Sequence, residues 1–343
     1  MTMHTTITTG HSARPRVMVV GKYRSIVHWA ENVSSAFRQN GCEVAQFAIN
    51  GQTVWHSLRY KFAGNEYGSQ ALPVRADFER ALQRFKPDLV VFIVIAALWM
   101  PEELFALARQ TRPGAATAVW IGDRLNAEEC RFAHHVDQVF ATDSAFIDDL
   151  RHYGHALPAH YLPLAVDPQR FHPFSLARSQ RLVYVANNSP GRGELIRQVR
   201  EPLVLYGKGW SKLADTAHDI HARRLPYRDL PRVYASHRAV LNIRNEKNVL
   251  HGLNQRSFEP YGCMTPVLND DMADLPRCFE PGKEILVWHS LAELEDLQSR
   301  LQRDSGFAQA VGLAGHRRVL AEHTWQHRIH SLLTAFDFQD VRS

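Results

Sequence analysis

The pattern of apolar and polar positions along the chain predicts strands that alternate with helices. An apolar run at residues 16–21 ends in a glycine, and apolar positions then recur three and four residues apart from Ile26 to Phe37. Gly41 ends this helical pattern, and a second apolar run follows at residues 43–49. A short strand, an amphipathic helix and a second strand are the opening of a parallel α/β sheet.

The pattern continues to residue 163. The uncharged run from Leu89 to Met100 is too short to cross a bilayer, which takes about 20 residues. Its residues 89–95 predict a strand that is buried on both faces. Ser144 is the expected N-cap of a helix. The other elements expected in this half are strands at 116–121, 138–141 and 159–163 and helices at 73–86 and 101–110.

Residues 164–179 carry two prolines and little periodicity, and we interpret them as a hinge. A second α/β series follows, so we expect two doubly wound halves with a ligand between them at the carboxyl ends of the strands. This series has expected strands at 181–186, 203–206, 239–243, 265–268 and 284–288, and expected helices at 194–199, 230–236, 258–264, 291–303 and 307–336.

The composition is that of a globular protein. The 343 residues are 45% hydrophobic and 22% charged, which excludes a disordered or fibrous chain. Forty Lys and Arg against 35 Asp and Glu leave a net charge of +5, which suits an anionic small ligand or a loose membrane-surface contact. The four cysteines form no CxxC pair, so we expect reduced thiols in a cytoplasmic protein. The polar N-terminus does not resemble a signal peptide.

The stretch at residues 239–271 carries the strongest candidate chemistry. Asn254, Arg256 and Glu259 follow a predicted strand and fall around the first turn of a predicted helix. Arg and Asn at such a place can donate to phosphate oxygens, and a carboxylate one turn later can accept the hydroxyls of a ribose. The alternative is a helix-capping arrangement with a surface ion pair, which needs no ligand.

A glycine-rich loop gives weaker evidence. Gly191-Arg192-Gly193 follows a predicted strand and opens a helix, but Ile196 stands where a dinucleotide motif has its third glycine. The backbone N–H groups of such a loop favour a phosphate, and Arg192 would add a charge-assisted contact. The alternative is an ordinary turn with a solvated arginine, and the loop taken alone favours this alternative.

Several sequence blocks, in the same order, are similar to those of one family. The chain resembles GT-B glycosyltransferases, specifically the CgeB-like (spore-maturation-protein-type) group of family 1/4-like glycosyltransferases. The resemblance covers roughly residues 16–336 and is most specific after residue 160. The blocks that carry it lie at residues 161–173, 205–210, 241–243, 254–259, 279–284, 289–294 and 323–328.

The resemblance implies that the chain binds a nucleotide-sugar donor. It implies a GT-B fold of two Rossmann-like domains: an acceptor-side domain at 15–163, a hinge at 164–179, a nucleotide-sugar-binding domain at 180–325 and a crossover helix at 326–343, after a disordered tail at 1–14. The matching donor-site residues are Glu259 for the ribose, Arg192 for the diphosphate, Asn254 and Arg256 for the diphosphate or sugar, Lys208 for the phosphates and Tyr227 for stacking on the base.

One position departs from the family pattern. Many retaining members carry two glutamates eight positions apart, and Glu259 corresponds to the second of them. The first would fall at 259 − 8 = 251, where this chain has His251. The departure leaves both the contacts to the donor sugar and the stereochemistry of transfer open.

Asp123 is the candidate catalytic residue of the N-terminal half. It follows a predicted strand and falls where related enzymes carry a His or Asp near the reacting sugar. An inverting transfer needs a base for the acceptor proton, whereas the alternative is an Asp that caps the next helix.

No metal or cofactor is expected. His323, His327 and His330 share a helix face but lack the HExxH form, and no Asp-x-Asp motif is present.

We therefore expect a metal-independent glycosyltransferase that moves a sugar from a nucleoside diphosphate to a hydroxyl of a bacterial surface glycan, a glycolipid or a protein. Its partners would be the nucleotide sugar and a glycan, lipid-linked or protein acceptor, without nucleic acid. His251 favours one alternative, a catalytically silent GT-B domain, and a nucleotide-sugar epimerase is another. A nucleic-acid-modifying glycosyltransferase is suggested only by the isoelectric point of about 9.1, because no basic run with interleaved aromatics accompanies it.

Overall fold

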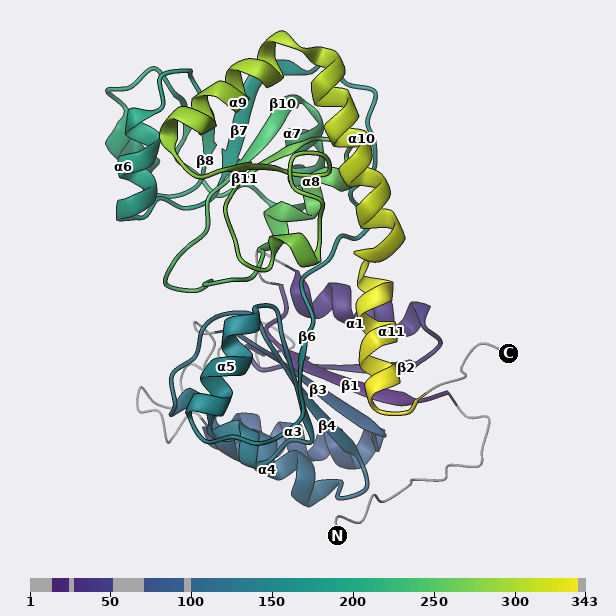
Figure 1. Ribbon diagram of the computed structural model, residues 1–343. Coiled ribbons are helices and arrows are strands. Elements are labelled where there is room, and N and C mark those ends of the chain that lie inside the picture. Colours follow the sequence, from purple (N-terminus) through teal and green to yellow (C-terminus); the bar gives the residue numbers. More distant parts are fainter. Residues whose placement is uncertain (1–13, 25–27, 52–70, 96–99, 339–343) are drawn as a thin grey trace.

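The computed structural model describes residues 14–24, 28–51, 71–95 and 100–338 (Figure 1). The expected disordered tail lies almost wholly outside these residues, as do residues 96–99 of the uncharged run. Two parallel six-stranded sheets form the two halves of the chain. This confirms the predicted α/β fold of two doubly wound domains.

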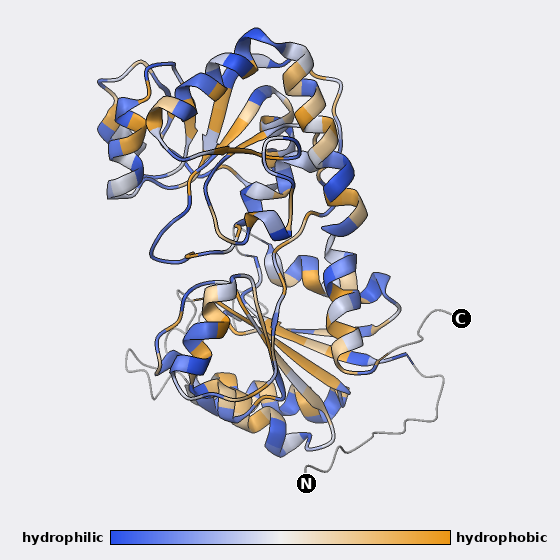
Figure 2. Ribbon diagram, viewed as in Figure 1, coloured by the Kyte–Doolittle hydropathy of each residue, from blue (hydrophilic) through white to orange (hydrophobic). Residues whose placement is uncertain are grey.

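The N-terminal domain contains the first sheet, in the strand order β2-β1-β3-β4-β5-β6. β3 (Leu89–Val94) is buried at every position, because helices cover both faces of a central parallel strand. Figure 2 shows the strands of this sheet as its most hydrophobic part. The other elements are β1 (Arg16–Gly21), α1 (Trp29–Gln39), β2 (Glu43–Ala48), α3 (Ala71–Phe85), α4 (Glu102–Thr111), β4 (Ala116–Ile121), the 3-10 helix η1 (Glu129–His134), β5 (Gln138–Ala141), α5 (Ser144–His152) and β6 (Ala159–Tyr161).

The C-terminal domain contains the second sheet, in the order β12-β11-β10-β7-β8-β9. Its strands are β7 (Ser179–Val185), β8 (Val204–Tyr206), β9 (Asp219–His221), β10 (His237–Asn242), β11 (Val267–Asp270) and β12 (Leu286–Trp288). Its helices are α6 (Pro190–Gln198), η2 (Trp210–Leu213), η3 (Tyr227–Asp229), α7 (Leu230–Ala235), η4 (Gln255–Ser257), α8 (Glu259–Gly262), η5 (Leu275–Arg277), α9 (Leu291–Arg303), α10 (Ser305–Glu322) and α11 (Trp325–Ala335).

Several predicted element boundaries were wrong, and three of them have a clear local cause. The N-cap of α5 is Asp143 instead of Ser144, because the Asp143 carboxylate accepts the Ala145 N–H. α6 begins at Pro190, four residues before the predicted start, since proline at a first helical position costs no hydrogen bond. The predicted helix at 307–336 breaks at Thr324, whose side chain caps α11. The short edge strand β9 was not predicted.

The final helix crosses back to the N-terminal domain, as expected. α11 lies beside α1 in Figure 1, and its apolar side chains join the core of the first sheet. The residues of α11 in this core are Trp325, Ile329, Leu332 and Leu333. The exact domain boundaries at residues 163, 179 and 325 stay predictions.

The two crossings between the domains run side by side. Val166, in the expected hinge, forms a bridge with Thr324 at the break between α10 and α11. Arg328 stabilises this junction through hydrogen bonds to both crossings. Its guanidinium is almost completely buried and donates to the carbonyls of Pro163, Leu164 and Glu322. Burial lowers the pKa of Arg328 to about 10, which leaves it charged at neutral pH.

Arg328→Met should therefore destabilise the protein. The variant leaves the buried carbonyl of Pro163 and the part-buried carbonyls of Leu164 and Glu322 without this donor, and an unpaired buried group costs about 1–3 kcal/mol. We expect a loss of about 1–3 kcal/mol in the free energy of unfolding, measured by urea titration. Arg317→Met is the matched control, since Arg317 is exposed on α10. Equal stability of the two variants would contradict this role of Arg328.

Candidate functional site

A cavity of about 490 Å³ lies between the two domains at the carboxyl ends of their strands. Its volume is in the range of small-molecule sites. Five lining residues come from the N-terminal domain: Trp29, Ile95, Gly122, Asp123 and Thr142. The C-terminal domain supplies most of the remainder, including the sequence-predicted residues Arg192, Tyr227, Asn254, Arg256 and Glu259.

The buried side chain of Asn242, at the end of β10, positions two of these residues. Its Oδ1 accepts from Asn254 Nδ2 at 3.1 Å and from Arg256 Nε at 3.0 Å. Its Nδ2 donates to Ser257 Oγ and Asn269 Oδ1. Because both ends of the amide are used, the loop before α8 is held in one arrangement.

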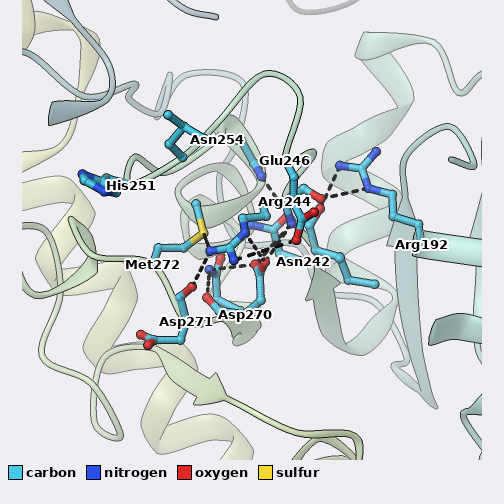
Figure 3. Close-up of polar contacts among 12 residues, drawn as sticks. Arg192, Asn242, Arg244, Glu246, His251, Asn254, Asp270, Asp271 and Met272 are labelled. Carbon is cyan, nitrogen blue, oxygen red and sulfur yellow. Dashed lines mark hydrogen bonds and ion pairs between the residues drawn. The ribbon is translucent and has the colours of Figure 1, made fainter. Parts of the chain in front are cut away.

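Two guanidinium groups converge over one buried aromatic ring. The Cζ atoms of Arg192 and Arg256 lie 6.0 and 5.9 Å from the ring centroid of Tyr184. Arg192 donates to the backbone carbonyls of Asn187, Ile243 and Arg244, which join the loops after β7 and β10. Figure 3 shows dashed lines from Arg192 to the backbone beside Arg244.

Neither guanidinium is neutralised by an acidic side chain. Over the described part of the chain, no carboxylate lies within ion-pair distance of Arg192 or Arg256. Arg192 is nine-tenths buried, and this burial lowers its pKa. Arg192 is also in the first turn of α6, where the helix dipole is positive. The cavity wall thus carries positive charge that an anion would stabilise.

Glu259 is buried at the start of α8 and lines the same cavity. Its Oε1 accepts a hydrogen bond of 2.9 Å from the hydroxyl of Tyr227. Burial raises the pKa of Glu259 from 4.5 to about 8, although the Tyr227 bond and the charge of Arg256 act in the opposite direction. The carboxyl group is thus held in place with hydrogen-bonding capacity for a polar ligand.

Tyr227 has different surroundings from those expected of a base-stacking residue. The ring of His28 stacks on it, with centroids 4.6 Å apart and planes 11° apart. The guanidinium of Arg170 lies 4.9 Å from its centroid. The ring therefore already has stacking partners, and its hydroxyl contacts Glu259. These contacts favour a role in positioning Glu259 over a role in stacking on a base.

Lys208 is not brought into the cavity. It is exposed in the loop after β8, and the cavity wall there is formed by Tyr206 and Gly207. The Lys208 backbone N–H donates to Asn187 Oδ1. Its side chain is not part of the cavity wall.

Asp123 lies on the N-terminal side of the cavity at a tightly packed position. Gly122 has no side chain because a Cβ would lie 2.1 Å from the ring of Trp29. On the other side of Asp123, the Arg124 N–H donates to the Asn248 carbonyl of the C-terminal domain. The next helix, η1, begins only at Glu129, so Asp123 does not cap it. The capping alternative is therefore wrong.

The loop before Asn254 is tied to the N-terminal domain by a buried carboxylate. Asp143 Oδ2 accepts from the N–H groups of Leu250 and His251, at 2.7 and 2.9 Å, while Oδ1 caps α5. Gly252 fits against this carboxylate because a Cβ there would meet the Thr142 carbonyl at 2.5 Å.

His251 consequently lies away from the cavity. Its exposed ring contacts Ser144 Oγ at 3.3 Å and lines a neighbouring hollow of about 720 Å³. In Figure 3 it lies on the opposite side of the view from Arg192. Whatever the first glutamate does in related enzymes, the imidazole of His251 does not take its place in the cavity wall.

His323, which follows α10, and His327, in α11, have structural contacts. His323 Nε2 donates to the Cys278 carbonyl, and His327 forms a capping box with Thr324. Among the described residues, no group of three His, Cys, Asp or Glu side chains could hold a metal ion.

Within the same part of the chain, no helix is both long and apolar enough to span a membrane. All four cysteines are buried and free.

Sequence reasoning missed Asn32, Asp143 and Asn242. Asp143 precedes a helical pattern and could have been identified as an N-cap. Asn242 lies inside a block that resembles the family, but its role depends on contacts with residues 254–257 and with Asn269 of β11 that form only in the fold. Asn32 belongs to an ordinary amphipathic helix and carries no signal in the sequence.

Glu259→Gln should remove a pH dependence of stability. Between about pH 4.5 and 8 the folded protein keeps a proton that the unfolded chain has lost, so wild-type stability falls as pH rises through this window. The fall is up to about 1.4 kcal/mol per pH unit. Urea titrations at about pH 5 and about pH 8 should show the variant gaining stability relative to wild type at the higher pH. A constant difference would contradict the raised pKa.

Comparison with protein families matches residues 180–334 to the glycosyl transferase-like family. The matched segment contains Arg192, Tyr227, Asn254, Arg256 and Glu259. No curated protein matches the chain in sequence.

Solved structures match the whole arrangement of both domains. A sucrose-phosphate synthase from Thermosynechococcus elongatus has a TM-score of 0.68 at 12% identity, covering 94% of this chain and 98% of its own. HepE from Anabaena, solved with UDP and glucose, has a TM-score of 0.68 at 11% identity, covering 94% and 100%. The lipopolysaccharide outer core galactosyltransferase WaaB has a TM-score of 0.60 at 13% identity, covering 94% and 99%. The chain therefore has the GT-B fold of glycosyltransferases, and its C-terminal domain matches the glycosyl transferase-like family.

Proposed function

We propose that the protein is a glycosyltransferase that moves a sugar from a nucleoside diphosphate to an acceptor hydroxyl. The observation that carries the proposal is the interdomain cavity, whose wall combines Arg192 and Arg256, without acidic partners, with the buried Glu259. A nucleoside diphosphate presents the complementary groups, an anionic diphosphate and a ribose with two hydroxyls. HepE, which has the same fold, binds UDP and UDP-glucose. UDP-sugars are therefore the first donors to test.

We assign a role to each of these groups in the departure of the diphosphate. Arg192 and Arg256 stabilise the negative charge that develops on the diphosphate as the glycosidic bond breaks. Their positions are fixed by backbone carbonyls and by Asn242, so little reorganisation is needed during the reaction. Asn254 lies beside Arg256 and offers an amide to the diphosphate or the sugar. These cations supply the charge stabilisation that a metal ion gives elsewhere, which supports metal-independent transfer.

We assign to Asp123 the role of the base that takes the acceptor proton. It is a carboxylate of the N-terminal domain that lines the cavity opposite the donor residues. A base at this position belongs to an inverting transfer. In a retaining transfer no base is required there, so the stereochemistry of the product tests the assignment.

The acceptor and the cellular setting follow by analogy. WaaB acts on the lipopolysaccharide outer core, which supports an acceptor in a bacterial surface glycan, a glycolipid or a glycosylated protein. Four free cysteines support a cytoplasmic location. The order of the sequence blocks supports membership of the CgeB-like group.

A second candidate function is a catalytically silent GT-B domain that binds a nucleotide sugar. The observation that favours it is His251, whose ring faces away from the cavity at the position of the first family glutamate. Such a domain would bind the donor without transferring or hydrolysing it.

Nucleotide binding should be specific and should require Glu259. A panel of UDP-, GDP-, dTDP- and CMP-sugars is screened by thermal shift. A ligand at about 100 times its dissociation constant stabilises by about 2.7 kcal/mol. We expect one nucleotide to raise the melting temperature of the wild type and of the exposed control Glu103→Ala, but not of Glu259→Ala. No shift with any nucleotide would refute the proposed donor site.

Asp123→Asn should separate binding from turnover. We expect its nucleotide affinity to stay within about twofold of wild type, while turnover falls by about 10²–10⁴, the contribution typical of a general base. Release of nucleoside diphosphate from the donor is the assay, and Asp296→Asn on the exposed face of α9 is the control. Undiminished turnover in Asp123→Asn would overturn the assignment.

A further inference from the structure

A hydrogen-bond chain connects the N-terminal domain to the carboxyl group in the cavity. Asn32 Nδ2, on α1, donates to the Tyr227 hydroxyl at 3.2 Å. The Tyr227 hydroxyl, in η3, donates to Glu259 Oε1 at 2.9 Å. All three side chains are at least nine-tenths buried. Residues from both domains thus meet in one chain that excludes water.

The chemistry of the three groups fixes the direction of the chain. A carboxyl oxygen that carries no hydrogen, as Glu259 Oε1 does here, only accepts, and an amide nitrogen only donates. The phenol has a single hydrogen, which it gives to Glu259, and it uses its oxygen to accept from Asn32. Each member therefore polarises the next, and loss of Asn32 weakens the bond that reaches Glu259.

The ring of Tyr227 is packed against one residue of the N-terminal domain and against residues of the connection between the domains. His28, just before α1, stacks on it, while Arg170, from the connection between the domains, lies over it at 4.9 Å. Phe171 contacts its edge. Separation of the domains would remove both His28 and Asn32 from Tyr227, and Glu259 would lose its oriented partner.

We propose that Asn32 and Tyr227 are positioning residues through which the N-terminal domain orients Glu259, so that the nucleotide site is complete only when the two domains are closed. The inference rests on the proposed nucleotide-binding function. Closure and nucleotide binding are then reciprocally coupled, because each stabilises the state that the other requires.

Asn32 gives the cleanest test because it does not line the cavity. Any effect of Asn32→Ala on nucleotide affinity must pass through Tyr227. Asn40→Ala is the matched control, since Asn40 is a buried amide at the end of the same helix and bonds to Ala36 and Gln326. The cycle consists of Asn32→Ala, Tyr227→Phe and the double variant, titrated calorimetrically with the diphosphate of the nucleotide that binds the wild type.

We expect each single variant to weaken binding by about fivefold or more. The double variant should bind no more weakly than Tyr227→Phe, because Asn32 has no other route to Glu259. Asn40→Ala should keep the wild-type affinity. Independent, multiplicative effects of the two substitutions, or wild-type affinity in Asn32→Ala, would overturn the proposal.

A pH profile separates positioning from general destabilisation. The Tyr227 bond favours the ionised form of Glu259 and lowers its pKa against the effect of burial. We expect nucleotide affinity to rise with pH as Glu259 ionises, and Tyr227→Phe should move this rise, measured from about pH 7 to about pH 9.5, to higher pH. An unmoved profile would contradict the proposal. The other titratable or charged groups that act on Glu259 are Arg256, Arg170, Asp167, Tyr234 and Cys263.

Failure of this proposal and failure of the proposed function give different results. If the wild type binds no nucleoside diphosphate, the proposed function is wrong and the positioning role falls with it. If the wild type binds and Asn32→Ala binds equally well with the same pH profile, the function stands and only the positioning role is wrong.

Discussion

The cavity depends on one buried carboxylate that belongs to the opposite domain. Asp143 caps α5 in the N-terminal domain and, with its second oxygen, accepts from two N–H groups of the loop before Asn254. A carboxylate that accepts several backbone hydrogen bonds is a strong anchor in a low-dielectric site. The contact between the domains therefore fixes the position of the loop that leads to Asn254, Arg256 and Glu259. The cavity is formed only where the two domains meet.

The charges around the cavity fit this construction. Arg192 and Arg256 are held by carbonyls, by Asn242 and by the ring of Tyr184, and no described carboxylate pairs with them. Burial of an unpaired cation costs free energy in the empty protein. An anionic ligand relieves that cost, which couples ligand binding to the closed arrangement. Burial has the corresponding effect on Glu259, an acidic group. It raises the pKa of Glu259, so that the carboxyl group is partly protonated in the protein without a ligand.

Sequence reasoning predicted most of the fold but only part of the site. Apolar runs such as residues 89–94 identify buried parallel strands because both faces are covered. Side chains in the segments that follow strands, such as Arg192 and Glu259, could be assigned to one edge of the sheet because the carboxyl ends of parallel strands meet there. Asn32 and Asp143 could not be assigned, because their partners lie more than 100 positions away and depend on how the domains meet. The outward position of His251 depends on the same contact.

A crystal structure of the protein with its nucleoside diphosphate would test the account most directly. We predict that the diphosphate lies between Arg192 and Arg256, that the ribose hydroxyls contact Glu259, and that Tyr227 keeps its bonds to Glu259 and Asn32. A nucleotide bound in the neighbouring hollow beside His251, or bound with its ribose away from Glu259, would contradict the account.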